Sequence, residues 1–182
     1  MATLVVAEHN NTSLSDATSK TVSAAKALGS DIDILVAGHG ASAAAEAATK
    51  IDGVRAVITV DHELLARQMP EAMQATIVSL MDGYDTVMAA DTATHKAYMS
   101  RVAAKLDTQQ ISSVTGVDGD VFERPIYAGN ALAYVKSNDP KKVVTVRTTA
   151  FPLSGEGGSA TSETKSVEIG ETGSAFVSEE LT

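Results

Sequence analysis

The sequence predicts an α/β fold, in which a doubly wound, mainly parallel β-sheet is covered by helices on both faces. Short apolar runs of strand length alternate with segments of helical length from residue 3 to residue 114. Connections of helical length are typical of parallel neighbours, because a tight turn can join only antiparallel strands. Two alternating runs around Gly129-Asn130 add a β-hairpin in the C-terminal half.

Five apolar runs and one more polar segment are the candidate strands of the sheet. The five runs are rich in Val, Ile, Leu and Ala and alternate little with polar residues, which is typical of strands buried on both faces. The sixth candidate, at residues 110–114, reads Gln-Ile-Ser-Ser-Val. No fixed-period repeat is present. The expected strands are residues 3–7, 32–37, 56–60, 86–90, 110–114 and 143–146.

Helix signals fall between these strands. Ser13 or Ser15 is expected to cap a helix that runs to Leu28, and Gly29 ends it. Pro70 is tolerated only in the first turn of a helix, so the segment 62–82 is expected to form two pieces. Its Met73, Ile77, Leu80 and Met81 form an apolar stripe that we interpret as core. Two further helices are expected at residues 42–50, which are almost all alanine, and 94–106.

The predicted hairpin has a first run at 126–128 and a second at 132–134. Between them, Gly129 and Asn130 are residues able to take positive φ. Pro125 lacks an N–H group, so the first run is expected at a sheet edge or at the start of a strand. Nothing in the hairpin pairs a nucleophile with a base, and the structural interpretation is a hairpin that closes one side of a sheet.

Composition limits the classes of function. The 182 residues form one domain with a tail, and with 44% hydrophobic but only 4% aromatic residues the core must be aliphatic. A net charge of −9 disfavours nucleic acids and anionic membranes as partners. The absence of cysteine excludes disulfides, thiolate catalysis and cysteine-ligated metals. The sequence shows no signal segment and no apolar run long enough to span a bilayer.

Two sequence patterns are candidates for a binding or catalytic site. Gly38-His39-Gly40 ends a strand before a helix, where an anion could bind, but Ala43 stands where a dinucleotide fingerprint has its third glycine. We interpret it as a tight strand-to-helix turn.

The four histidines are the second pattern. His9, His39 and His62 follow predicted strands and so are expected at the carboxyl edge of the sheet, whereas His95 opens a helix. No pair has metal-ligand spacing. His9 is the best candidate for a functional histidine, because the adjacent Glu8 is expected to raise its pKa. No Gly-x-Ser-x-Gly elbow occurs. We therefore predict no catalytic, cofactor-binding or metal-binding residue.

The chain also resembles a known family. Residues 123–131 read Glu-Arg-Pro-Ile-Tyr-Ala-Gly-Asn-Ala and residues 144–149 read Val-Thr-Val-Arg-Thr-Thr. Together with Val-Val-Ala-Glu-His at 5–9 and Val-Ala-Gly-His at 36–39, they resemble the N-terminal domain of the electron transfer flavoprotein alpha subunit. The resemblance covers nearly the whole chain. It implies a sheet of the adenine-nucleotide-hydrolase-like (Rossmann-like) type.

The resemblance implies residues 1–150 as an alpha-subunit-type N-terminal α/β domain. Residues 151–182 are then an acidic flexible tail or linker, which in the family leads to a flavin-binding domain that is absent here. They hold six acidic residues and one lysine, and residues 154–159 are rich in Gly and Ser.

The complete family member pairs with a beta subunit, holds FAD in its second domain, and carries electrons from dehydrogenases to a quinone reductase. The expected role is therefore a scaffold and beta-subunit contact, without a catalytic site of its own and without a cofactor in this chain alone. A separate flavin-binding domain is a further expected partner. The expected location is the bacterial cytoplasm, or the mitochondrial matrix if a transit peptide was removed.

On this interpretation the motif residues are structural or lie at an interface. Tyr127 and Tyr134 are the best anchors, because tyrosine buries a large rigid area while its hydroxyl still finds a partner. The alternative is that both tyrosines pack on the domain's own sheet. The full set of candidate interface or structural residues is Arg124, Tyr127, Asn130, Tyr134 and Arg147.

The chain departs from the family pattern in two places. His95 and Ser100 replace a glycine and a proline, and Ser113 stands where the family usually has an acidic residue. The alternative function is a free-standing nucleotide-binding module related to adenine-nucleotide-binding stress proteins, which would use the carboxyl edge of the sheet.

Overall fold

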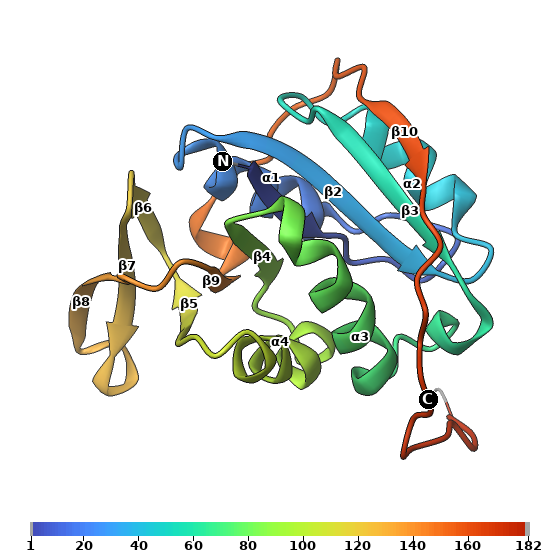
Figure 1. Cartoon of the computed structure of the whole chain (residues 1–182). Coiled ribbons are helices and arrows are strands. Elements are labelled where there is room, and N and C mark those ends of the chain that lie inside the picture. Colours follow the sequence, from blue (N-terminus) through green and yellow to red (C-terminus); the bar gives the residue numbers. More distant parts are fainter. Residues whose placement is uncertain (1, 181–182) are drawn as a thin grey trace.

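The computed structural model describes residues 2–180 and is built on a seven-stranded sheet, as shown in Figure 1. All neighbouring strands are parallel, in the order β10-β3-β2-β1-β4-β9-β5. The chain builds outward from β1 in both directions, which confirms the doubly wound, mainly parallel α/β fold. The strands are β1 (Ala2–Val6), β2 (Asp31–Gly38), β3 (Ala56–Asp61), β4 (Thr86–Ala90), β5 (Gln110–Val114), β9 (Lys142–Val146) and β10 (Thr161–Thr164).

Two helices cover each face of the sheet (Figure 1). On one face lie α1 (Asp16–Lys26) and α2 (Ser42–Thr49); on the other lie α3 (Pro70–Leu80) and α4 (Ala93–Lys105). Ser15 caps α1, since its hydroxyl accepts a hydrogen bond from the Ala17 N–H group at 3.3 Å. The predicted break in the third helical segment is confirmed, because a short 3-10 turn (Glu63–Leu65) precedes α3 and Pro70 occupies the first turn of α3.

The core has one apolar layer on each side of the sheet. The alanine face of α2 lies against the first layer through Ala44, Ala45 and Ala48, where small side chains let the helix approach closely. In the second layer Met73 and Ile77 of α3 are fully buried. The methionine stripe is therefore core, as its spacing predicted.

The hairpin forms a sheet of its own. Strands β7 (Val121–Ile126) and β8 (Ala131–Lys136) pair antiparallel, and β6 (Gly116–Asp118) joins them on the other side of β7 (Figure 1). The hairpin in the C-terminal half is confirmed, but it does not close a side of the main sheet, because β9 returns from the hairpin into that sheet between β4 and β5. The buried side chain of Phe122 ties this small sheet to the first core layer.

Pro125 lies where β7 has an unpaired edge. The Glu123 carbonyl accepts a hydrogen bond from the Thr115 N–H group at 2.9 Å, so the polar backbone groups of residue 123 face β6. Residue 125 faces the same way by alternation, but β6 pairs with β7 only at residues 121–123. The missing N–H group therefore breaks no hydrogen bond, although β7 is the central strand of its sheet.

The turn of the hairpin differs from its prediction. Strand β7 ends at Ile126, and a 3-10 turn follows in which Tyr127, Ala128 and Gly129 have φ of 49°, 53° and 89°. Asn130 has a φ of −76°. Of the two predicted turn residues Gly129 takes positive φ and Asn130 does not, and the assignment of Ala128 to a strand is wrong.

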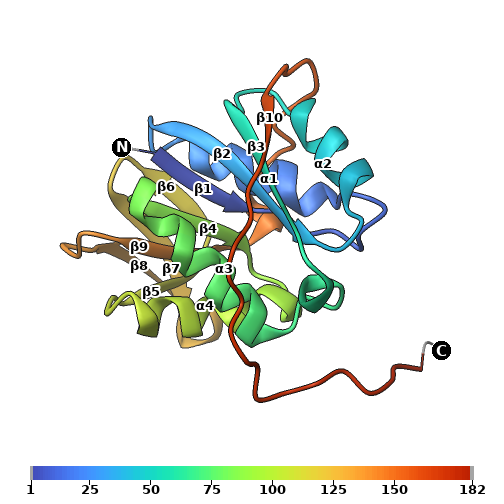
Figure 2. The ribbon, with the colours of Figure 1, turned by 45° about the vertical axis from the view of Figure 1, so that its right-hand side comes forward.

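The last part of the chain runs along the outer edge of the sheet. The N–H groups of Gly157 and Gly158 both donate to the Lys50 carbonyl at 3.0 Å. Only glycine fits at position 158, because a Cβ atom there would lie 2.2 Å from the Ile51 carbonyl oxygen. Strand β10 then pairs with β3, and the chain continues past α3 (Figure 2). The division of the chain near residue 150 stays a prediction.

Candidate functional site

The outer face of the hairpin exposes three large side chains. Tyr127 is 79% exposed, Tyr134 67% and Leu132 51%. Leu132 and Tyr134 share one face of β8 because side chains alternate along a strand. Glu123 lies opposite Tyr134 on β7, and its hydrogen bond with the tyrosine hydroxyl raises the pKa of Tyr134. This exposure excludes the alternative that both tyrosines pack on the domain's own sheet.

Tyr127 is held outward by a strained turn. Left-handed backbone is unfavourable for a large side chain, and such strain persists only where the surroundings enforce it. Asn130 supplies the constraint, since its backbone N–H group and its side-chain Nδ2 donate to the Tyr127 carbonyl at 3.1 and 2.8 Å.

The five predicted residues do not form one cluster. Tyr127, Asn130 and Tyr134 lie on the hairpin's turn and outer face. Arg124 lies on the opposite face of β7, half-buried against the rest of the domain. Arg147 follows β9, where its side chain is exposed and its N–H group donates to the Val114 carbonyl at 2.9 Å. Only the first three residues can contact one partner surface together through the hairpin.

The carboxyl edge of the main sheet gathers the histidines as predicted. His9 Nδ1 accepts from the Asn11 N–H group at 3.1 Å, and its Nε2 donates to the Ala37 carbonyl at 3.1 Å. Burial lowers the pKa of His9, so the expectation that Glu8 raises it is wrong. Across residues 2–180, no group of three His, Asp or Glu side chains could hold a metal ion.

His95 is a buried side chain at the start of α4. Its Nδ1 donates to the Ala90 carbonyl at 3.0 Å, and the Tyr98 ring meets it edge-on at 5.6 Å between centroids. Burial lowers the pKa of His95. This histidine is a neutral core residue that packs the first turn of α4.

The strand-to-helix turn at Gly38-His39-Gly40 does not fit a phosphate group. The His39 N–H group donates to Asn11 Oδ1 at 3.2 Å, and the Gly40 N–H group donates to Asp61 Oδ2 at 3.0 Å. These two donors are therefore not free to bind an anion, and one of them is bound to a carboxylate, although α2 itself has no side-chain cap. The interpretation as a tight turn is supported, and the Asp61 carboxylate at this turn opposes the phosphates of a nucleotide or of FAD.

Comparisons with known proteins support the family resemblance that these sequence motifs indicate. A family model described as "Electron transfer flavoprotein domain" matches residues 3–172. The chain belongs to the electron transfer flavoprotein family. It is 50% identical over 183 residues to the electron transfer flavoprotein subunit alpha of Pseudomonas aeruginosa, and 50% identical over 182 residues to that of Bradyrhizobium diazoefficiens. The mitochondrial alpha subunit of Dictyostelium discoideum is 43% identical over 166 residues.

These relatives are longer than the chain. The matches cover 100% of this chain but 59% and 58% of the two bacterial proteins; for the Dictyostelium protein the shares are 84% and 46%. In the part of the chain that the structure describes, no helix has the length and apolar character to cross a membrane.

Ser113, a departure from the pattern of the electron transfer flavoprotein family, has a defined structural role. It lies at an irregularity of β5 with a φ of 56°, and its hydroxyl donates to Asp91 Oδ2 at 2.7 Å. Burial raises the pKa of Asp91, but hydrogen bonds from Ser113 and Lys96 outweigh burial and leave the pKa lowered. An acidic residue at position 113 would face the Asp91 carboxylate instead.

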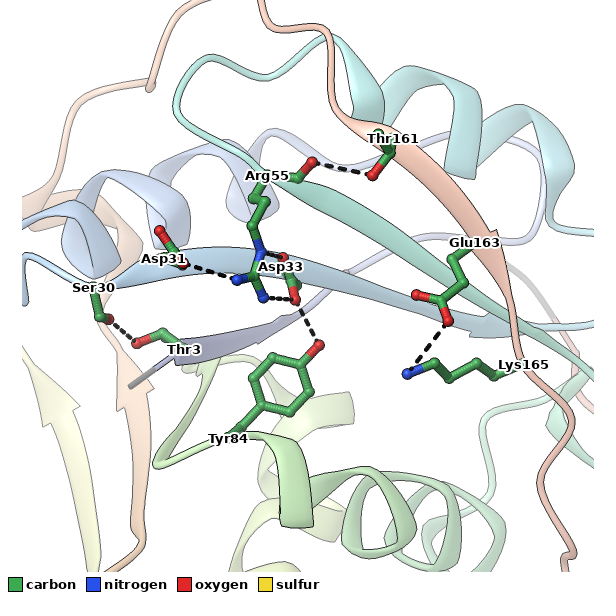
Figure 3. Close-up of polar contacts among 9 residues, drawn as sticks. All are labelled: Thr3, Ser30, Asp31, Asp33, Arg55, Tyr84, Thr161, Glu163 and Lys165. Atoms are coloured by element: carbon green, nitrogen blue, oxygen red, sulfur yellow. Dashed lines mark hydrogen bonds and ion pairs between the residues drawn. The ribbon is translucent and has the colours of Figure 1, made fainter.

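One polar cluster of the structure was not predicted from the sequence. Asp33 on β2 is only 3% exposed, and its carboxylate accepts hydrogen bonds from Arg55 and from the Tyr84 hydroxyl (Figure 3). All three residues lie at the amino edge of the sheet. The sequence does contain an indication of this cluster, because a carboxylate within an otherwise apolar buried strand requires a buried partner. The Nε, Nη1 and Nη2 atoms of Arg55 all donate to Asp33 or Asp31, so we interpret this cluster as structural.

Proposed function

We propose that this chain acts as the scaffold domain of an electron transfer flavoprotein alpha subunit and that the outer face of its hairpin contacts a beta subunit. The whole assembly would be the FAD-dependent electron carrier between dehydrogenases and a quinone reductase. The observation that supports the contact is the exposure of Leu132 and Tyr134 on β8 and of Tyr127 in the adjoining turn. Exposed aromatic and aliphatic side chains grouped in this way are typical of interaction sites, where tyrosine often contributes strongly to binding.

The strain at Tyr127 supports the same assignment. A tyrosine in left-handed backbone is less stable than a glycine at that position, yet Asn130 holds the turn in place. Glu123 and Lys136 lie beside the apolar side chains and would form the polar rim that interfaces commonly have. Neither the apolar side chains nor the two charged side chains have a redox or catalytic role in the proposal.

In this proposal the chain is an electron-carrier subunit and not an enzyme by itself. FAD would be held by a separate flavin-binding domain, because the carboxyl edge of this sheet does not fit its phosphates. The chain would then work in the bacterial cytoplasm, or in the mitochondrial matrix in organisms with a mitochondrial form.

The test replaces the two tyrosines one at a time. Tyr127→Ser and Tyr134→Ser are each expected to weaken binding to a purified beta subunit by at least about tenfold. Both side chains are exposed, so the free energy of unfolding should change by less than about 0.5 kcal/mol. Calorimetric titration and urea unfolding measure the two effects.

Val177→Ser is the matched control, because Val177 is also exposed but lies in the C-terminal segment, outside the hairpin. It should leave binding unchanged. Retained affinity in both tyrosine variants, or equal loss in the control, would contradict the proposed interface.

A further inference from the structure

A cavity of about 390 Å³ lies beneath the base of the hairpin. It lies between the start of β5 and the end of β8, with Gln110 and Ile111 on one side and Arg124 and Val135 on the other. The segment after β8, including Asp139, closes one end. Its volume falls within the range of small-molecule sites.

Arg124 brings an uncompensated positive charge to this cavity. Its Nε atom is buried and has no hydrogen-bond partner among residues 2–180. The ion pairs formed within this range do not include Arg124 either. A buried charged donor without a partner is costly, and an anionic acceptor would satisfy it.

Gln110 supplies an acceptor in the same cavity. Its Nε2 atom donates to Ser112 Oγ at 3.0 Å, which turns the Oε1 atom away from the serine. That Oε1 atom is buried and has no partner in the described part of the chain. Two residues that line the cavity therefore each have a buried polar atom without a partner, a donor on the Arg124 cation and an acceptor on Gln110.

The remaining charged groups at the cavity already have partners. Lys136 pairs with Asp120 outside the cavity. Asp139 accepts hydrogen bonds from Thr108, from the Gln109 N–H group and from Ser137, and these bonds lower the pKa of Asp139. Its negative charge opposes a second negative charge on any ligand.

We propose that this cavity binds a small carboxylate with one negative charge and an adjacent hydrogen-bond donor, that is, a 2-hydroxy or 2-amino acid. The carboxylate accepts from Arg124, and the hydroxyl or ammonium group donates to Gln110 Oε1. Ile111 and Val135 provide an apolar wall for a short aliphatic side chain. Ligands with two negative charges are excluded by Asp139.

The ligand contacts proposed for this site are separate from the apolar side chains of the proposed subunit contact, although Lys136 lines the cavity and also belongs to the rim of that contact. Arg124 and Val135 lie on the inner face of the hairpin, whereas Leu132 and Tyr134 lie on its outer face. Loss of beta-subunit binding and loss of ligand binding can therefore be measured independently.

The test is a titration of the ¹⁵N-labelled chain with L-lactate, L-alanine, acetate and sodium chloride at equal ionic strength. Lactate or alanine is expected to cause saturable shifts in the amide signals of residues 109–111 and 137–139, and the one that does so identifies the class of ligand. Acetate, which lacks the second donor, should bind at least about tenfold more weakly, and chloride should cause no saturable shift.

Two variants separate the proposed contacts from general charge effects. Arg124→Gln should abolish the saturable shifts, while Gln110→Leu should remove the preference for lactate or alanine over acetate. Lys105→Gln removes the same charge from an exposed site on α4 and should leave binding unchanged. Shifts that stay linear for all four solutes would show that only water and bulk ions enter the cavity. Equal affinity in Arg124→Gln would show that Arg124 does not hold the carboxylate. Either result would overturn the proposal.

Discussion

At the scale of single residues, the Asp33 carboxylate is a buried charge that is held by hydrogen bonds from two neighbouring side chains. It is bound by Arg55 through Nε at 2.9 Å and Nη2 at 2.6 Å, and by the Tyr84 hydroxyl at 2.7 Å. Hydrogen bonding to Asp33 raises the pKa of Arg55 above its usual range. Burial and the hydrogen bond to Asp33 both raise the pKa of Tyr84. The cluster joins three segments that are far apart in the sequence.

Arg55→Met should therefore be strongly destabilising. The substitution leaves a buried carboxylate without its cation, and the free energy of unfolding should fall by about 3 kcal/mol. Tyr84→Phe removes one hydrogen bond to the same carboxylate and should cost about 1.5 kcal/mol. Urea unfolding measures both. In an Asp33→Asn background Arg55→Met should cost clearly less, since no charge is stranded; an equal cost in both backgrounds would contradict this account.

The buried histidines predict how stability depends on pH. Burial lowers the pKa of His9 and of His95, so the unfolded chain binds protons more readily than the folded one. The stability due to the neutral rings is complete above the ordinary pKa of about 6.5 and is lost as the pH falls through that value toward the lowered folded pKa values. The opposing effect of Glu8 on His95 is smaller than that of burial.

Unfolding free energies between about pH 7.5 and pH 5.5 should fall toward acid, with at most about 1.4 kcal/mol per pH unit for each histidine. His95→Asn should reduce the slope by roughly half, and the non-titrating control Lys105→Gln should keep it. A slope that does not change in His95→Asn would assign the pH dependence to other groups.

At the scale of elements, sequence patterns found the strands that are held by apolar side chains and missed those that are not. Strands β1 to β4 and β9 contain Val, Ile, Leu or Met runs, and β5 contains only Ile111 and Val114. The positions of all six strands agree with prediction within two residues. Strand β10 reads Thr-Ser-Glu-Thr and is fully exposed, so its pairing rests on backbone hydrogen bonds that leave no side-chain pattern. Strand β6 is three residues long, which is too short for periodicity.

The pairing of β10 with β3 gives an element-scale prediction. The Thr161 N–H group donates to the carbonyl of Arg55, just before β3, at 3.1 Å, and the Lys165 N–H group donates to the Thr59 carbonyl on β3 at 2.9 Å. By alternation the Glu163 N–H group also faces β3 and that of Ser162 faces away. Glu163→Pro should therefore detach β10 and increase the rate of proteolysis near residues 155–165. Ser162→Pro, which removes an outward N–H group, should have a smaller effect.

Because β10 buries no side chain, Glu163→Pro should lower the free energy of unfolding by only about 1 kcal/mol. Limited proteolysis with mass spectrometry and urea unfolding measure the two effects. Equal protection in the two proline variants would show that backbone pairing does not hold this strand.

At the scale of the whole molecule, the candidate site was only partly visible in the sequence. The tyrosines of the hairpin were recognised, but their exposure depends on β9 entering the main sheet between β4 and β5, which leaves the hairpin as a separate small sheet. Arg124 belongs with them to the motif that carries the family resemblance, yet strand alternation places it on the opposite face. The partner of Asp33 lies on another strand, so sequence alone predicted neither the pairing nor its location.

The distribution of charge over the molecule gives the last prediction, which concerns flavin. The chain has a net charge of −9, and the carboxyl edge of its main sheet carries the carboxylates of Glu8, Asp61 and Asp91. The strand-to-helix turn there uses its N–H groups to bind Asn11 and Asp61. A dinucleotide such as FAD would bring two phosphates to an edge that repels them and has no free donors in that turn.

The purified 182-residue chain is therefore expected to be colourless after incubation with FAD and gel filtration, without the flavin absorbance at about 450 nm. Asp61→Asn removes one carboxylate and weakens the bond to the Gly40 N–H group, but Glu8 and Asp91 still oppose phosphate, so this variant should remain colourless too. Stoichiometric flavin in the unmodified chain would show that this sheet binds the cofactor itself. Flavin in the Asp61→Asn variant alone would show that one carboxylate is what excludes it.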